Sequence, residues 1–137
     1  MKTPFIAVGS LLVILNANTM ANPVPHQVTF TCPTTRVIAN FGDYIAGYGV
    51  STILGENRPV YFKSLTKNAT VPNNLTSYAI AGTLYDSTTS QVICNYNSSI
   101  ANNKPFSLVY TMTNGSGGVI TAQTDSIISI QLPIGIQ

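Results

Sequence analysis

The side chains that could do acid–base chemistry are few in this sequence. It has one histidine, His26, and four acidic residues, Asp43, Glu56, Asp86 and Asp125. A general base needs partner groups nearby, and His26 stands in a proline-containing stretch close to the expected start of the mature chain. A glycosidase needs two carboxyl groups that converge on one cleft, whereas each acid here lies in or near an expected turn, where aspartate often bonds to local backbone. We therefore predict no catalytic residues and no enzymatic activity.

Other reactive motifs are incomplete. The run Gly47-Tyr48-Gly49-Val50-Ser51-Thr52 has the glycines of a phosphate loop but lacks its lysine, and the sequence offers no strand-to-helix context for phosphate binding. Serines are plentiful, but no Gly-x-Ser-x-Gly elbow occurs. No Cys-x-x-Cys spacing is present either, and His26 with scattered acids makes a poor ligand set. The sequence predicts no cofactor and no metal site.

The two cysteines, Cys32 and Cys94, are the only possible pair. In an oxidising compartment such a pair forms a disulfide by default. A bridge between positions so far apart stabilises a fold by about 4 kcal/mol in the chain-entropy model. We therefore expect a structural disulfide, with a redox or metal-binding pair as the alternative.

The N-terminal segment has the layout of a secretory signal. Lys2 is followed by an apolar run over residues 5–15 and then by small residues that end at Ala21. The apolar run is too short for a membrane span, which needs about 20 residues. We expect cleavage after Ala21, with Ala17 as the alternative. The chain then divides into a signal peptide (1–21) and a single β domain (22–137), located outside the cell or in the periplasm.

Charged residues make up only 7% of the chain, against roughly 25% in an average soluble domain. The formal net charge is +2, and loss of Lys2 with the signal would bring the mature chain close to neutral. Nucleic acids and anionic membranes attract basic surfaces, which this composition does not provide. We expect no nucleic-acid partner and no stable membrane span after signal cleavage.

Hydrophobic residues of the mature chain recur with period two, as in Val28, Phe30 and Cys32. No stretch keeps apolar residues at helical spacing for three turns. Loops are expected over 51–58 and 66–76. Strands are expected over 28–32, 36–41, 44–50, 78–85, 91–96, 106–112, 119–123 and 126–132, and a further apolar stretch opens at 60–62. This pattern predicts an all-β fold, a small antiparallel β-sandwich or barrel of about 7–8 short strands with one disulfide.

Seven tyrosines and no tryptophan give the chain its aromatic character. Most of these rings are expected in the core or in cross-strand pairs. A tyrosine ring can also pack and form hydrogen bonds at low entropic cost, which suits a binding surface. We single out Tyr44, Tyr48, Tyr61 and Tyr85 as a possible binding face for a protein or glycan partner.

Two short motifs carry a resemblance. With Thr31-Cys32-Pro33 and the Val-x-Cys-x-Tyr strand in Gln91-Val92-Ile93-Cys94-Asn95-Tyr96, the chain resembles small secreted bacterial proteins of unknown function. Those have an early Cys-Pro and a late Val-x-Cys-x-Tyr strand that begins a hairpin. The resemblance implies secretion, one disulfide and a β fold, and it implies no activity. Residues 51–76 have no counterpart in this scheme.

The sequence thus favours an exported, non-enzymatic β domain with a binding or envelope role. One alternative is a self-assembling, fimbria-like subunit that donates the apolar segment 127–132 to a neighbour by strand addition. A small secreted hydrolase is a further, less favoured alternative.

Overall fold

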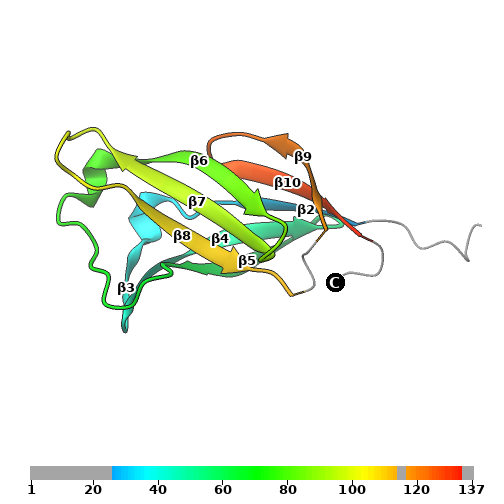
Figure 1. Cartoon of the computed structure of the whole chain (residues 1–137), viewed down its shortest axis with the longest axis horizontal. Helices are drawn as coiled ribbons and strands as arrows, with labels where there is room; N and C mark the ends of the chain where they lie inside the picture. The colour runs from blue at the N-terminus through cyan, green and yellow to red at the C-terminus, as the bar shows by residue number, and fades with distance from the viewer. Residues whose placement is uncertain (1–25, 114–116, 134–137) are drawn as a thin grey trace, which may run out of the picture.

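The computed structural model describes residues 26–113 and 117–133, so the expected signal peptide lies outside the described residues. These residues form one antiparallel sheet of nine strands that curls into a nearly closed barrel (Figure 1). Within the described ranges there is no α-helix, only two short 3-10 turns, η1 (Thr35–Val37) and η2 (Leu75–Ser77). The predicted all-β class is confirmed.

The strands follow one another along the sheet in the order β6-β7-β8-β5-β4-β2-β10-β9, and β3 pairs with β4. Their bounds are β2 (His26–Thr31), β3 (Ala39–Phe41), β4 (Tyr44–Ile53), β5 (Glu56–Lys63), β6 (Tyr78–Asp86), β7 (Gln91–Ser98), β8 (Phe106–Thr111), β9 (Val119–Gln123) and β10 (Ile127–Leu132).

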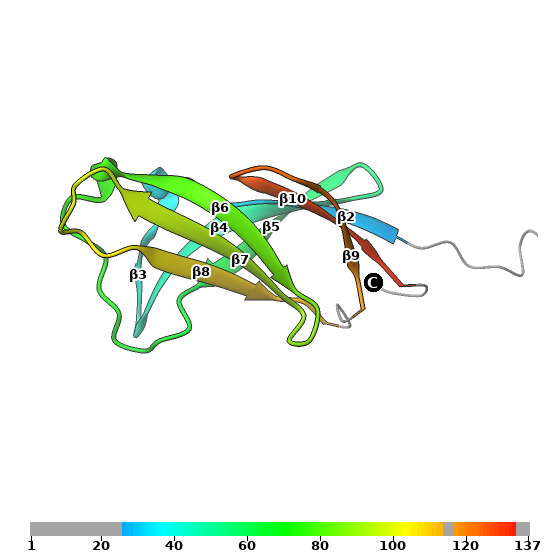
Figure 2. The same cartoon turned by 45° about the horizontal axis from the view of Figure 1, so that its top comes forward.

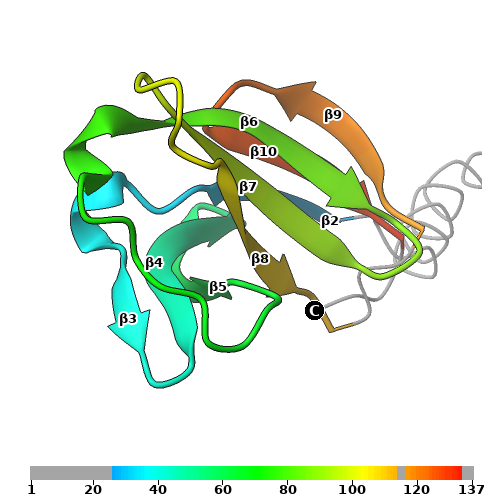
Figure 3. The same ribbon diagram turned by 60° about the vertical axis from the view of Figure 1, so that its left-hand side comes forward.

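The sheet consists of two walls that are weakly joined. One wall is β6-β7-β8 and the other is β5-β4-β2-β10-β9, and only the pair Lys63–Val109 joins them through β5 and β8. Beyond this pair β5 and β8 diverge, and the β4–β5 hairpin extends past the end of β8 (Figure 2). At the opposite seam, β6 faces β9 and β10 (Figure 3). There Thr83 Oγ1 donates to the carbonyl of Thr124 at 2.9 Å, and Gln123 Nε2 donates to the carbonyl of Thr83.

The hydrophobic core fills the space between the two walls because the strands that form it turn alternate residues inward, whereas β3 and β9 contribute no buried residue. On β7 these are Val92, Cys94 and Tyr96, all fully buried. On β10 they are Ile128 and Ile130, also fully buried. The alternation that predicted these strands therefore also identifies their inward faces.

A disulfide ties the walls together. Cys32 directly follows β2, Cys94 lies in β7, and their Cα atoms are 5.9 Å apart across a sequence separation of 62. Tyr96 Oη adds a second link by donating to the carbonyl of Pro33 at 2.6 Å. We call this part of the interior the closed end, defined by Cys32, Pro33, Thr83, Cys94 and Tyr96.

Two expected elements were wrong. Residues 36–41 do not form one strand, because η1 occupies 35–37 and only Ala39–Phe41 pairs with β4. Residues 51–58 are not a loop, because β4 continues to Ile53 and β5 begins at Glu56. The two-residue turn between them has Leu54 at φ +52° and Gly55 at φ +82°. Two positive φ angles are typical of the tight turns that match the twist of a hairpin.

Pro59 lies inside β5 rather than in a turn. It is opposite Val50 in the β4–β5 register. Proline has no N–H to donate. In a strand it therefore occupies a position where the backbone nitrogen points away from the paired neighbour. The backbone nitrogen of Pro59 therefore points to the free edge of β5. This is the edge on the side of β8, which is unpaired at Pro59 among the described residues.

The glycine run that superficially resembled a phosphate loop is a segment of β4. A Cβ atom on Gly49 would collide with the carbonyl oxygen of Thr31 and lie 2.8 Å from the ring of Phe62. Glycine at this position thus lets β2 and Phe62 approach β4 closely.

Candidate functional site

Four aromatic side chains gather on the outer surface of β3, β4 and β5. We call Phe41, Tyr44, Tyr48 and Tyr61 the aromatic face. Tyr48 is opposite Tyr61 in the register, and their ring centroids are 5.3 Å apart. The rings of Phe41 and Tyr61 are 5.8 Å apart. Tyr48 is 57% exposed, Phe41 42% and Tyr61 36%, so water reaches rings that also support one another.

Strand geometry explains this gathering. Tyr44, Ala46 and Tyr48 alternate along β4 and share its outer side. Ala46 is small and fully buried, and this allows Phe41 and Tyr61 to meet across β4 from the strands on either side. The aromatic face is therefore held by two strand pairings as well as by ring contacts.

The four side chains of the face are themselves uncharged, and the nearest charges along the chain are those of Asp43 and Lys63. Lys63 Nζ lies 4.5 Å from the centroid of the Tyr44 ring, a cation–π distance. Farther along β5, Glu56 and Arg58 form an exposed ion pair of 3.3 Å. A surface of this kind offers ring faces and hydroxyl groups with little electrostatic preference for an ionic partner.

The structure brings together three of the four tyrosines singled out from the sequence. Tyr85 lies elsewhere, on β6, where its hydroxyl accepts the backbone N–H of Gly118 at 3.0 Å. Phe41 was not anticipated. Only tyrosines were singled out from the sequence, and residues 36–41 were expected to form one longer strand. The apolar residues Ala39 and Phe41, separated by the polar Asn40, form the pattern that would have identified Phe41 as a residue of this face.

The acidic residues are dispersed. Asp86 accepts hydrogen bonds from the backbone N–H groups of Thr88 and Thr89, and these bonds, Thr88 first, hold the pKa of this exposed carboxyl below its usual value. This is the local turn bonding expected for aspartate. Asp43 lies in the turn before β4, and Asp125 lies between β9 and β10. In the ranges 26–113 and 117–133, no three of the His, Cys, Asp and Glu side chains are grouped so as to hold a metal ion.

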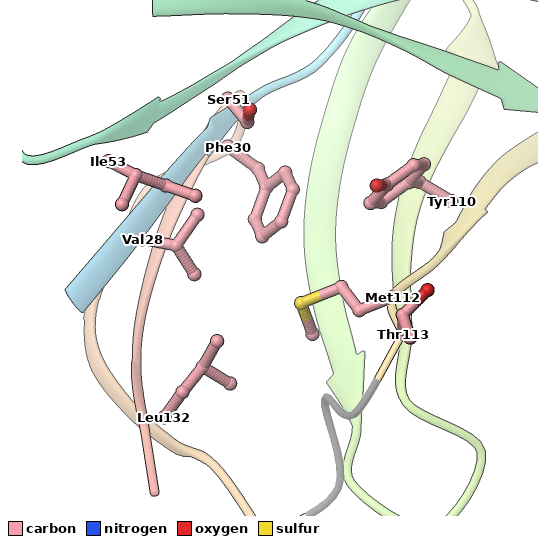
Figure 4. Close-up of a pocket in the computed structure, with 8 residues that line it drawn as sticks. All are labelled: Val28, Phe30, Ser51, Ile53, Tyr110, Met112, Thr113 and Leu132. Carbon is pink, nitrogen blue, oxygen red and sulfur yellow. The ribbon is translucent and has the colours of Figure 1, made fainter. Parts of the chain in front are cut away.

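A hollow lies inside the barrel, between β2, β4 and β10 on one side and the end of β8 on the other (Figure 4). It is a cavity of about 380 Å³. Its lining residues are Val28, Phe30, Ser51, Ile53, Tyr110, Met112, Thr113 and Leu132. We call this part of the interior the open end. An adjoining depression shares Ser51, Ile53 and Tyr110 with it and reaches the Glu56–Arg58 pair.

Two hydroxyl groups in this cavity have no hydrogen-bond partner among the described residues. Ser51 is 6% exposed, and Tyr110 is half-buried, with its ring 5.6 Å from that of Phe30. Figure 4 shows both hydroxyl groups directed toward the cavity from opposite walls. A buried hydroxyl without a partner costs about 1–3 kcal/mol. The placement of Ser51 is therefore unfavourable for the fold alone, whereas Tyr110 is only half-buried.

Comparisons with known proteins give no match to a family model, to a curated protein or to a solved structure. The resemblance drawn from the Cys-Pro and Val-x-Cys-x-Tyr motifs stays a prediction. Among the described residues, no helix is long and apolar enough to cross a membrane.

Proposed function

We propose that this protein is an exported, non-enzymatic domain that binds a neutral glycan through its aromatic face. The observation that carries the proposal is the contact of Phe41, Tyr48 and Tyr61 on a solvent-exposed strand surface. Folding normally removes such rings from water, and contiguous exposed apolar surface is characteristic of interaction sites. Strand pairing holds the rings in place before a partner arrives, which reduces the entropic cost of binding.

The low charge of the face favours a neutral partner. Lys63 packs against Tyr44, and the backbone of this region is already engaged in strand pairing. Sugar rings present C–H groups and hydroxyls, which suit tyrosine side chains with both an apolar ring and a polar end. Export is supported by the signal-like N-terminus and by the disulfide, which is typical of an oxidising compartment.

The absence of catalysis is supported by the surroundings of the acids. Asp86 is engaged by its own turn, and Glu56 is paired with Arg58. Asp43 and Asp125 lie in two different turns. Hydrolysis of a glycosidic bond requires two carboxyl groups facing the same bond, and the aromatic face has a single acid beside it along the chain, Asp43 in the turn between Phe41 and Tyr44.

The test is titration of the protein with neutral oligosaccharides, namely cellohexaose, maltohexaose and chitohexaose, followed by NMR. We expect chemical-shift changes in β3, β4 and β5, and loss of binding in Tyr48→Ala and in Tyr61→Ala. Leu84→Ala is the matched control, because Leu84 is 52% exposed but lies on β6.

Two results would contradict the glycan proposal. One is that none of the three sugars causes chemical-shift changes. The other is loss of a protein partner in Tyr48→Ala while the sugars stay inactive, which would assign the same face to protein recognition.

Strand donation by residues 127–132 remains an alternative, with less support. β10 is paired with β2 on one side and with β9 on the other, and its buried side chains belong to the core. Donation to a neighbour would require opening the domain. Deletion of residues 126–137 distinguishes the two functions, because a folded monomer that no longer polymerises would favour assembly, whereas an unfolded monomer would contradict it.

A further inference from the structure

We infer that the cavity at the open end binds a single acyl chain, with the hydrocarbon between the two walls and its carbonyl oxygen bonded to the hydroxyls of Ser51 and Tyr110. This site is independent of the aromatic face, because Ser51 lines the interior whereas Tyr48 is on the outer side of β4. Three features of the cavity lead to the inference: its apolar walls, its two free donors and the polar depression beside it.

The walls are suited to a flexible hydrocarbon. Val28, Ile53 and Leu132 provide branched aliphatic surface, and Met112 adds an adaptable thioether. The volume of about 380 Å³ lies at the low end of the range for small-ligand sites, about 300–1,000 Å³. A cavity of this size suits one chain better than a two-chain lipid.

The donors fix which end of the ligand carries oxygen. Ser51 and Tyr110 reach the cavity from β4 and β8, and both hydroxyls lack a partner among the described residues. Buried hydroxyls normally have hydrogen-bond partners. A carbonyl or carboxylate group in the cavity provides oxygen acceptors for these two hydroxyls, which an acyl compound has and a plain alkane lacks.

The adjoining depression gives the head group a route to water. It shares Ser51 and Tyr110 with the cavity, and it carries Arg58 and Glu56, which are joined at 3.3 Å and largely exposed. Because Arg58 is a cation and Glu56 an anion, the pair gives this exit no net charge. Both a free fatty acid and an acyl ester fit the inferred chemistry.

The test uses isothermal titration calorimetry of the oxidised protein with sodium decanoate and, separately, with monodecanoylglycerol, each below its critical micelle concentration. We expect one-to-one binding of at least one compound with a negative heat-capacity change, the mark of apolar burial. Binding of decanoate alone would identify a fatty acid as the ligand. Binding of the glyceride alone would identify an ester, and binding of both would show that the acyl group itself is recognised. No binding of either compound would overturn the inference.

Variants locate the site. We expect Ser51→Ala and Tyr110→Phe each to raise the Kd about fivefold, the effect of one lost hydrogen bond. Thr52→Ala is the matched control, because Thr52 neighbours Ser51 but bonds to Asn57 on the other side of β4. It should leave the Kd unchanged.

A further variant keeps the inference testable if the polar contributions are small. Ile53→Phe places a ring at the half-buried rim of the cavity and should abolish binding while the protein still unfolds cooperatively. Unchanged affinity in Ser51→Ala, Tyr110→Phe and Ile53→Phe together would place the acyl compound elsewhere and overturn the inference. Tyr48→Ala separates this site from the aromatic face, because it should affect sugars and leave decanoate binding intact.

Discussion

The closed end and the open end of the barrel interior differ in how their polar groups are satisfied. At the closed end, Tyr96 donates to the carbonyl of Pro33 and Thr83 donates to that of Thr124, so each buried hydroxyl has a partner. At the open end, the hydroxyls of Ser51 and Tyr110 face a cavity without a partner among the described residues. One end is arranged for stability. The other leaves the buried hydroxyl of Ser51 without a partner, at the cavity where we infer that an acyl chain binds.

Removal of the disulfide at the closed end should cause the largest change in the free energy of unfolding. In the Cys32→Ala/Cys94→Ala double variant we expect the free energy of unfolding to fall by about 4 kcal/mol, because the cross-link no longer restricts the unfolded chain. Urea unfolding measures the change, and the reduced wild-type protein serves as the comparison. A loss below about 1 kcal/mol would contradict the role assigned to the closed end.

Thr83→Val tests the seam between β6 and β9. Thr83 is 2% exposed, and the substitution leaves the Thr124 carbonyl without its donor. We expect a loss of about 1–3 kcal/mol in the free energy of unfolding. Thr121→Val is the matched control, because Thr121 is exposed and its hydroxyl donates to either of two acceptors, Oε1 of Gln27 at 3.2 Å or the carbonyl of Ser129 at 3.3 Å. Equal losses in the two variants would show that burial at the seam adds nothing.

Tyr96→Phe tests the second link at the closed end and its dependence on pH. Burial raises the pKa of Tyr96 above its usual value of about 10. The stability this phenol contributes is therefore complete below pH 10 or so and is lost as pH rises through the higher pKa of the folded state. We expect Tyr96→Phe to cost about 1 kcal/mol at neutral pH, and to lose less stability than the wild type above pH 10 or so.

Urea unfolding of Tyr96→Phe at a series of alkaline pH values gives this comparison. Tyr48→Phe is the control, because Tyr48 lies on the exposed face and its change leaves the Tyr96 contribution in place. Identical alkaline slopes in wild type and Tyr96→Phe would contradict the prediction.

Ser51→Ala should have the smallest effect, and one of opposite sign. The substitution removes a buried hydroxyl that has no partner among the described residues, so we expect the free energy of unfolding to rise by up to about 1 kcal/mol in the ligand-free protein. The same urea experiment measures it. A loss of stability instead would mean that the hydroxyl is satisfied in the folded state, and the contrast between the two ends would weaken.

The sequence was informative where side chains alternate clearly. The strand containing Val92, Cys94 and Tyr96 could be predicted with its inward face, because a half-buried strand places every second residue in the core. The disulfide required only the count of two cysteines and an assumption about the compartment. Both features depend on local pattern or composition alone.

The candidate sites depend on which strands become neighbours, which the alternation does not specify. Tyr48 and Tyr61 meet because a tight turn at Leu54 and Gly55 sets the β4–β5 register. A leucine at positive φ gives no clear sequence signal, so this hairpin was expected as a loop. Tyr85 shares residue type with the others but lies on a strand of the other wall. The cavity was not predictable for the same reason, since its lining residues come from β2, β4, β10 and the end of β8.

Pro59 has a consequence for the behaviour of the molecule in concentrated solution. A barrel with unpaired strand edges next to an opening presents a template on which a strand of another molecule can pair, the first step toward aggregation. On the free edge of β5, an incoming strand would meet a position with no N–H to offer. The missing donor interrupts the hydrogen-bond ladder that such pairing needs, so this edge of β5 resists polymerisation.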